Sequence, residues 1–366
     1  MAFGSEIFLY MLNIKKLQID LKKEIILIRV DSSFDIGGGH LSRCIAFSEY
    51  TKKQNFEIIF ITTSNETYSQ IKLKENCILV TSQNGSMEEV LQEFKHNYTI
   101  KCLVSDINYS NKKDDKEKYY NFLKLVKHCG ILLITFEIPE EDIFPADCVI
   151  IPYVGSEAIR YKHFNKNNYL LGSDYFLLGN DFIDMHKKYE FSSNVNTIMI
   201  SMGSSDPENI TIKILKALVL GNEAIHLDIV LGSMSNISHE TISSILYNYP
   251  GSWKLHKNPK NLAKIMHKAD LAICNNGLTR YELASVGVPT VYISNRKQEI
   301  KLSDLFASFG CALHLGWHAD LNLKEIASKI FGLIHHQDTR KIMSNRGVEL
   351  IDGNGMSRVF HKIMSL

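Results

Sequence analysis

The sequence predicts an α/β protein with two doubly wound, Rossmann-like domains that face a central cleft. Short, continuous apolar runs alternate with segments of helical periodicity, as expected for parallel strands covered by helices on both faces. The alternation stops near residue 165 and resumes near residue 195, and 366 residues are too many for one small core. Because such sheets bind ligands at the carboxyl ends of their strands, we expect each domain to carry part of one site.

The first predicted domain covers residues 24–165 and follows an N-terminal extension, residues 1–23. Its strands are predicted from the apolar runs EIILIRV, FEIIFITT, CILVT, CLVSDI, ILLITFE and CVIIPY. The intervening segments LSRCIAFSEYTKK, SMEEVLQEFKHNY and KDDKEKYYNFLKLVKHC have helical periodicity and charged outer faces. Strand, helix and strand in repetition favour a parallel sheet wrapped by helices.

An inter-domain connection is predicted over residues 166–194, which are rich in Asn, Tyr and Lys and lose the alternation. The second domain, residues 195–350, takes its strands from NTIMISMG, HLDIVLG, SWKLHKN, DLAICNN and TVYISN. Its helices include NITIKILKALVL and KNLAKIMHKA. Residues 351–366 are predicted to form a C-terminal helix that crosses back to the first domain.

The composition argues against several classes of protein. Lys and Arg number 41 against 40 Asp and Glu, so the charge balance gives no reason to expect a nucleic acid or an anionic membrane as partner. The seven cysteines lie mostly in or beside apolar runs, which favours reduced, buried thiols over disulfides or a zinc site. No convincing signal peptide or membrane-spanning run is apparent, so we expect a soluble, cytoplasmic protein.

A glycine-rich loop follows the first predicted strand, in DSSFDIGGGHLSRC. Gly37, Gly38 and Gly39 lie where a strand ends and a helix begins, which indicates that something approaches the backbone closely. His40 then lies at the helix start, where unpaired N–H groups suit a diphosphate and a general base could reach a reacting atom. The alternative is a tight turn whose histidine only caps the helix. Neither a complete dinucleotide fingerprint nor a P-loop is present.

A second strand-to-helix junction lies in ICNNGLTRYELASVGVP. Gly277 follows a predicted buried strand, Thr279 opens a helix, and Glu282 lies one turn further on. The N–H groups and the hydroxyl suit a phosphate, and the carboxylate suits the hydroxyls of a ribose. Alternatively, Glu282 is only the capping-box partner of Thr279, and the spacing does not separate the two interpretations.

The turn in MGSSDPENIT is a third such junction. Gly203, Ser204 and Ser205 are candidates to face the same cleft. For Asp206 itself, capping of the following helix is the preferred interpretation.

The motifs resemble those of a known family over nearly the whole chain. IRVDSSFDIGGGHLSRC is similar to an Arg-x-Asp-x-Ser…Ile-Gly-x-Gly-His-x-x-Arg signature, ISMGSSDPENIT to a Gly-Gly-Ser-Asp-Pro-x-Asn turn, and NNGLTRYELASVGVP to a Gly-Gly-x-Thr-x-x-Glu segment. YLLGSDYFLLGNDF and DGNGMSRV also resemble family segments. The family comprises the UDP-2,4-diacetamido-2,4,6-trideoxy-β-L-altropyranose hydrolases of pseudaminic acid biosynthesis and related spore-coat polysaccharide proteins. The resemblance implies a glycosyltransferase-B-type fold.

The family resemblance also implies a reaction and a set of site residues. The chain would hydrolyse a nucleotide-activated amino sugar, most simply a UDP-sugar, on a pathway to a nonulosonic acid or another surface glycan. His40 would activate water at the anomeric carbon, with neither a metal nor another cofactor required. The residues on the sugar side would be Asp31, Gly37, Gly38, Gly39, Arg43 and Asp106, although a structural ion pair is an equal interpretation of Asp31 and Arg43. The nucleotide would be held by Gly203, Ser204, Asn276, Gly277, Leu278, Thr279 and Glu282.

Departures from the family pattern leave the sugar and the acceptor open. SDINYS stands where Asp-x-Tyr is common, the paired glycines become Asn276-Gly277 and Gly203-Ser204, and Glu137 is the nearest carboxylate where an Asp-Asp pair is usual. One alternative is therefore a glycosyltransferase of the same fold, with a UDP- or CMP-sugar donor and a glycan or peripheral membrane acceptor. A second alternative is a non-catalytic protein that binds a nucleotide-sugar.

Overall fold

The structure is a computed structural model that describes residues 17, 19–20, 22–31, 38–73, 75–81, 85–107, 113–136, 146–158, 168–186 and 188–366, with the backbone alone at 113–116. The chain divides into two compact units. Unit 1 comprises Met1–Pro152, Ser156–Leu171 and Met356–Leu366, and unit 2 comprises Tyr153–Gly155 and Gly172–Gly355.

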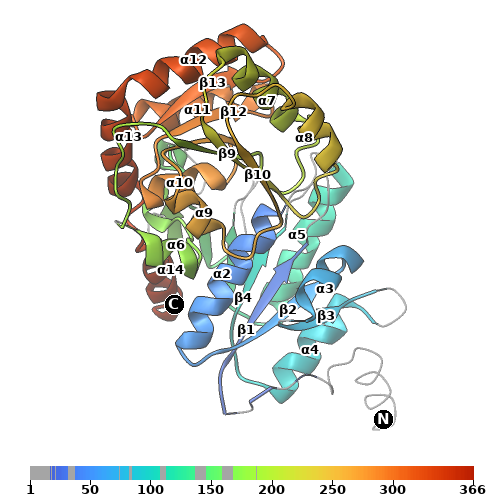
Figure 1. The fold of residues 1–366 in the computed structure, drawn as a ribbon. Coiled ribbons are helices and arrows are strands. Elements are labelled where there is room, and N and C mark those ends of the chain that lie inside the picture. The colour runs from blue at the N-terminus through green and yellow to red at the C-terminus, as the bar shows by residue number, and fades with distance from the viewer. Residues whose placement is uncertain are drawn as a thin grey trace. The chain divides into compact units, whose positions relative to one another are not determined.

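Unit 1 contains a parallel sheet with helices on both sides (Figure 1). Its described strands are β1 (Ile25–Val30), β2 (Glu57–Thr62), β3 (Asn76–Leu79), β4 (Ile100–Asp106), β5 (Leu133–Phe136), β6 (Cys148–Ile151) and β7 (Tyr169–Leu171). Its described helices are α2 (Gly39–Lys53), α3 (Asn65–Ile71), α4 (Met87–Asn97), α5 (Lys113–His128), the short 3₁₀ helix η2 (Ser156–Ala158) and α14 (Gly355–Met364), whose first residue is counted with unit 2.

The strand order of unit 1 creates a switch point at its centre. The order is β3-β2-β1-β4-β5-β6-β7, so the chain starts at β1, proceeds to one edge and then returns to the other side of β1. The β1–β4 pair is parallel, with Val30 opposite Asp106 at the carboxyl end. Ligands of open α/β sheets bind at such a reversal, which draws attention to the residues that follow β1 and β4.

Unit 2 repeats this organisation. Its described strands are β8 (Thr197–Ser201), β9 (His226–Leu231), β10 (Trp253–Lys257), β11 (Leu271–Asn275), β12 (Thr290–Ser294) and β13 (Ala312–Trp317). Its described helices are the 3₁₀ helix η4 (Ser173–Tyr175), α6 (Asn180–Met185), α7 (Ile210–Gly221), α8 (His239–Ile245), α9 (Leu262–His267), α10 (Thr279–Val286), the 3₁₀ helix η5 (Lys297–Glu299), α11 (Ile300–Ser308), α12 (Leu323–His335) and α13 (Gln337–Leu350).

The unit 2 sheet has the order β10-β9-β8-β11-β12-β13, and its switch point lies between β8 and β11. Alternate strand residues serve opposite faces. Ile198 and Ile200 of β8 pack in an apolar cluster with α7, α8 and α12, whereas Met199 packs in another with α9, α10 and α11. The sheet is thus covered on both sides, which explains its continuous apolar strands.

Every strand predicted from an apolar run is present, and the structure adds elements that the pattern did not reveal. Strands β7 and β13 and helices α3 and α8 were not predicted, and the predicted connection, residues 166–194, contributes β7 to unit 1 and α6 to unit 2. The C-terminal helix α14 packs in unit 1, where the ring of Phe360 contacts Tyr50 and Phe56. These contacts explain why a segment so late in the chain is counted with the first unit.

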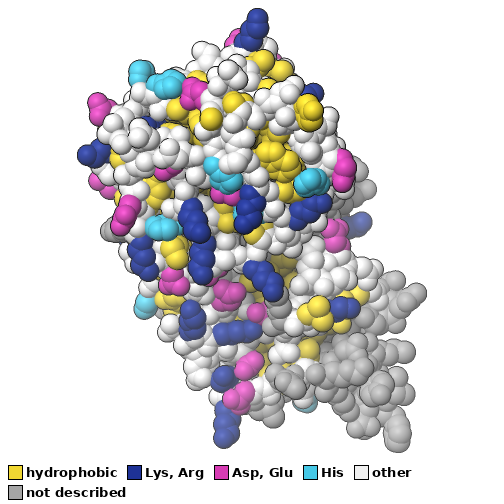
Figure 2. Space-filling view, viewed as in Figure 1, with side chains coloured by type: hydrophobic (Ala, Val, Ile, Leu, Met, Phe, Trp, Pro, Cys, Tyr) yellow, Lys and Arg dark blue, Asp and Glu magenta, His cyan; other side chains and the backbone are white. Residues whose placement is uncertain are grey.

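Two expectations from composition can be compared with the structure. All seven cysteines are buried and free, as predicted. Positive and negative side chains are interspersed on the face that Figure 2 shows, in keeping with a net charge of +1. In the described ranges, no helix combines the length and the apolar character that a membrane span needs.

Candidate functional site

His40 lies in the first turn of α2, and its side chain turns to the end of β4. Helix α2 starts at Gly39 with Gly38 in the N-cap position, and no side chain caps it. The imidazole Nδ1 instead lies 2.6 Å from Oδ1 of Asp106. The histidine therefore does not act as a helix cap, which was the alternative to a functional role. Gly37, another predicted loop residue, lies outside the described residues.

Asp106 is fully buried and its carboxylate is saturated with donors. Arg43 donates through Nε to Oδ2 at 2.5 Å and through Nη2 to Oδ1 at 2.6 Å, and the Cys44 thiol lies 3.4 Å from Oδ2. Burial alone would raise the pKa of Asp106, but the charge of Arg43, the charge that His40 carries when protonated, and the hydrogen bonds from both residues outweigh it. The pKa of Asp106 consequently lies well below its usual value, and the group is ionised at neutral pH.

The ionised partner fixes the tautomer of His40. A carboxylate only accepts hydrogen bonds, so the 2.6 Å contact requires a proton on Nδ1 of the histidine. The 3.0 Å approach of Arg43 Nη2 to the same nitrogen is then a contact without a hydrogen bond. In the neutral form of this imidazole, Nε2 carries the lone pair, and none of the described residues bonds to it. Since the His40 side chain is 16% exposed, this nitrogen is placed to accept a proton from a ligand or a water.

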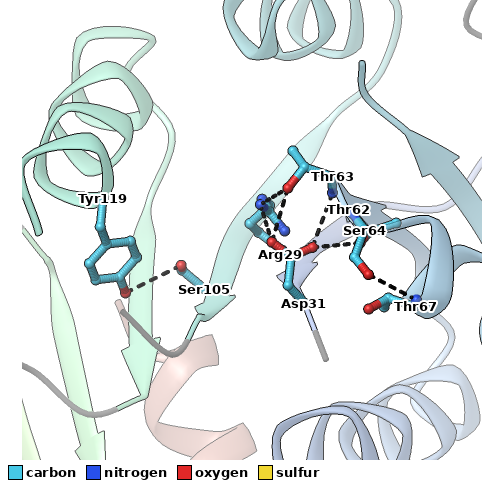
Figure 3. A network of polar contacts seen from close by, with 8 residues as sticks. All are labelled: Arg29, Asp31, Thr62, Thr63, Ser64, Thr67, Ser105 and Tyr119. Carbon is cyan, nitrogen blue, oxygen red and sulfur yellow. Dashed lines mark hydrogen bonds and ion pairs between the residues drawn. The ribbon is translucent and has the colours of Figure 1, made fainter. Parts of the chain in front are cut away.

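Asp31 belongs to a different polar cluster, at the ends of β1 and β2 (Figure 3). It accepts hydrogen bonds from Arg29 Nη2 and Thr62 Oγ1, both at 2.6 Å, and from the backbone N–H of Thr63 at 3.0 Å. Burial opposes ionisation of Asp31, but Arg29 and the hydroxyl and amide donors lower its pKa. The sequence allowed a structural ion pair as the role of Asp31 and Arg43. In the structure each of them pairs with another residue, Asp31 with Arg29 and Arg43 with Asp106.

In unit 2, one buried amide joins the two glycine turns at the switch point. Asn275, the last residue of β11, donates through Nδ2 to the carbonyl of Met202 at 2.8 Å and accepts the N–H of Gly277 through Oδ1 at 3.1 Å. Gly203 has a φ of +83°, and a Cβ there would lie 3.0 Å from the same Nδ2. Asn275 thus fixes both turns. The sequence did not reveal this role, because Asn275 lies within a segment that the apolar pattern predicts as a strand.

Two further segments contact the glycine turns that Asn275 joins, the turn after β9 and the chain around η5. A Cβ on Gly232, after β9, would lie 2.4 Å from the Cα of Ser204, so a glycine is required for the two backbones to approach. The backbone N–H of Met234 donates to the Ser204 carbonyl at 3.0 Å. Asn276 points the other way, with Nδ2 donating to Glu299 at 2.7 Å and Oδ1 accepting the N–H of Asn295 at 3.2 Å. The Asn276 side chain is thus held by the chain around η5.

Helix α10 begins at Thr279 without a side-chain cap, Leu278 being the N-cap residue. The capping box that the Thr279–Glu282 spacing allowed is therefore not formed. No described residue bonds to the carboxyl group of Glu282, and burial raises its pKa to about 7. By contrast, the Asp206 carboxylate accepts the N–H groups of Ile210 and Thr211, both at 2.9 Å, so its predicted capping role is confirmed.

The predicted residues thus gather at two switch points. His40, Arg43 and Asp106 meet at the end of β1 and β4, with Asp31 in the separate cluster beside them on the sheet. The nucleotide-side candidates meet at the end of β8 and β11. In the part of the chain that the structure describes, no three His, Cys, Asp or Glu side chains are grouped so that they could hold a metal ion.

The fold, two α/β units that each have a parallel sheet, is of the glycosyltransferase-B type. Similar solved structures include MurG from Acinetobacter baumannii (TM-score 0.62, 14% identity, covering 94% of this chain and 100% of that one). Also similar is UDP-GlcNAc 2-epimerase from Neisseria meningitidis bound to UDP-GlcNAc (TM-score 0.58, 12% identity, 94% and 100%). The glycosyltransferase CalG4 has a TM-score of 0.59 (11% identity, 94% and 98%). The predicted fold class is confirmed.

Comparison of sequences gives more specific relatives. The uncharacterized protein MJ1062 of Methanocaldococcus jannaschii is 30% identical over 278 residues, which is 73% of this chain and 55% of that protein. This chain thus spans about half the length of that relative. The spore coat polysaccharide biosynthesis protein SpsG of Bacillus subtilis is 24% identical over 338 residues, 91% of this chain and 95% of SpsG. No protein-family model matches the chain.

Proposed function

We propose that this chain is an enzyme of surface polysaccharide biosynthesis that hydrolyses a nucleotide-activated amino sugar, most simply a UDP-sugar. The observation that carries the proposal is the His40–Asp106 pair at the unit 1 switch point, which directs Nδ1 of His40 to the carboxylate and leaves Nε2 available as a base. The similarity to SpsG supports the pathway, and the similarity to the fold of nucleotide-sugar enzymes supports the substrate class.

In the proposed reaction, Nε2 of His40 accepts a proton from a water whose oxygen attacks the anomeric carbon. The new C–O bond forms while the bond from that carbon to the diphosphate oxygen breaks, and UDP leaves with the electron pair. His40 then returns its proton to solvent. Asp106 acts as a positioning residue, because it is fully buried, holds the productive tautomer and stabilises the imidazolium that forms. Its predicted place among substrate-binding residues is therefore replaced by this indirect role.

The nucleotide is assigned to unit 2. The uncapped N-terminus of α10, with Gly277 and Thr279, offers N–H groups and a hydroxyl to the diphosphate. Glu282, whose carboxyl group has no partner among the described residues, is assigned to the hydroxyls of the ribose. Gly203, Ser204, Asn276 and Leu278 would line the same turns.

A glycosyltransferase is the second candidate, favoured by the similarity to the folds of MurG and CalG4. The same base would then deprotonate a hydroxyl of a glycan or lipid-linked acceptor instead of water. Unit 2 would keep its role toward the nucleotide.

A phosphorus NMR time course separates the two candidates. The purified protein is incubated with a panel of UDP- and CMP-sugars without acceptor, beside His40→Ala and, as a matched control, the exposed histidine variant His239→Ala. Release of free UDP by wild type and His239→Ala alone supports the hydrolase. Binding without release favours the transferase, and an absence of binding to every sugar contradicts both.

A further inference from the structure

Arg280 is a buried cation in the first turn of α10. It is 7% exposed, and its guanidinium carbon lies over the rings of Tyr281 at 5.2 Å, Tyr292 at 5.4 Å and Phe306 at 4.8 Å. Nη1 donates to Ser303 Oγ across 3.4 Å, and Nε is buried with no hydrogen-bond partner among the described residues. Within the described ranges, Arg280 makes no ion pair with a carboxylate.

The groups around Arg280 do not neutralise it. Burial raises the pKa of Cys274 and of Tyr292 well above their ordinary values, although Arg280 opposes this in part. Both side chains are therefore uncharged at neutral pH. Aromatic rings stabilise a cation through their electron-rich faces but carry no net charge. The full positive charge of Arg280 remains uncompensated in a region where desolvation is costly.

The position of this charge relates it to the proposed nucleotide site. Arg280 is the second residue of α10, directly after Thr279, and the first N–H groups of this helix have no side-chain cap. The helix dipole adds a partial positive charge at the same end. Since the surroundings are apolar, both contributions act on a nearby anion with little screening.

We infer that Arg280 is the built-in counter-charge for the diphosphate of the nucleotide: a positioning residue that makes unit 2 select a nucleoside diphosphate over the neutral nucleoside. The inference rests on the proposed function, because it takes UDP as the ligand of α10. A carboxylate partner would have cancelled the field of Arg280 at the ligand. The aromatic enclosure stabilises the cation and leaves its charge for the anion.

Isothermal titration of UDP and of uridine tests this role. Arg280→Met keeps the length of the side chain and removes the charge, and Arg280→Lys keeps the charge. Arg280→Met should weaken UDP about tenfold or more and leave the affinity for uridine unchanged, whereas Arg280→Lys should retain most of the preference for UDP. Arg346→Met, at an exposed arginine of the same unit, is the matched control and should bind both ligands like wild type.

A second readout separates electrostatics from packing. Removal of an uncompensated buried charge should raise the melting temperature of ligand-free Arg280→Met, whereas loss of a structural arginine should lower it. Inorganic pyrophosphate should raise the melting temperature of wild type and of Arg280→Lys more than that of Arg280→Met.

The outcomes that overturn the inference are distinct from failure of the proposed function. If wild type binds UDP and Arg280→Met binds it equally well, or loses uridine by the same factor, the inference is wrong and the proposed function stands. If Arg280→Met does not fold, loss of the preference for UDP in Arg280→Lys overturns the inference. If wild type binds neither UDP nor pyrophosphate, the proposed function fails and the inference fails with it.

Discussion

At the unit 1 switch point a buried carboxylate forms ion pairs and hydrogen bonds, whereas at the unit 2 switch point two ionisable groups have no ion-pair partner among the described residues. Asp106 is bonded to Arg43 and His40 in the interior of unit 1. In unit 2, no described residue bonds to the carboxyl group of Glu282 or forms an ion pair with Arg280. Arg280 is buried and Glu282 is half-buried, and ionisable groups in such positions are costly unless something compensates them. The difference suggests that unit 1 holds a preformed base, whereas unit 2 is completed by its ligand.

The largest expected effect follows from removing the base of unit 1. His40→Ala should lower turnover of the nucleotide-sugar by about 100-fold or more, because proton transfer in the transition state is lost. The dissociation constant for UDP should change little, since the nucleotide is assigned to unit 2. Steady-state kinetics and titration with UDP measure the two quantities. Turnover at the wild-type rate would contradict the role of His40.

The next effect comes from the buried carboxylate. Asp106→Asn should lower turnover by about tenfold or more, because an amide no longer selects the Nδ1–H tautomer of His40. It should also destabilise unit 1 by about 3 kcal/mol, because Arg43 is left buried without a counter-charge. Urea denaturation and kinetics measure both. Since the pKa of Asp106 is lowered on folding, its contribution to stability is present above pH 4 and is lost as the pH falls further.

A control for Asp106 is available in the same unit. Asp31→Asn removes a carboxylate that also pairs with an arginine but has no contact with His40. It should destabilise the protein without a comparable loss of turnover per folded molecule. Equal losses of turnover in both variants would mean that the two ion pairs act in the same way, and the comparison within unit 1 would fail.

How far the sequence could predict this picture differs between the two units. The apolar runs predict the strands, and the glycine-rich loop predicts the place of His40 at a strand-to-helix junction. The partner Asp106 is 66 residues away, and the pairing depends on β4 lying beside β1, which the order of elements does not dictate. Arg280 was missed because a charged residue in a helical pattern reads as exposed until its burial is known.

A smaller effect is expected from the amide that joins the glycine turns of unit 2. Asn275→Ala leaves the Met202 carbonyl and the Gly277 N–H without their partner and should cost about 1–3 kcal/mol of stability. It should also raise the dissociation constant for UDP, whereas the rate at saturating substrate should change less. Asn276→Ala, whose side chain bonds to Glu299 and not to the turns, is the matched control. If both variants bind UDP like wild type, Asn275 does not position the nucleotide turns.

The smallest effect is a pH dependence that distinguishes a ligand-completed carboxyl from a paired one. Burial raises the pKa of Glu282 from 4.5 in the unfolded chain to about 7, so the folded state holds its proton more tightly. The contribution to stability is therefore complete below pH 4.5 and is lost as the pH rises through 7, opposite to that of Asp106. Glu282→Gln should remove this slope, and thermal denaturation at pH 5 and pH 8 measures it. The variant should be more stable than wild type at pH 8. It should nevertheless bind UDP more weakly, because a carboxylate has two oxygens that accept hydrogen bonds from the ribose hydroxyls, whereas the amide has one. A variant that loses stability at pH 8 would mean that Glu282 is already paired within the folded chain, and the contrast between the two units would disappear.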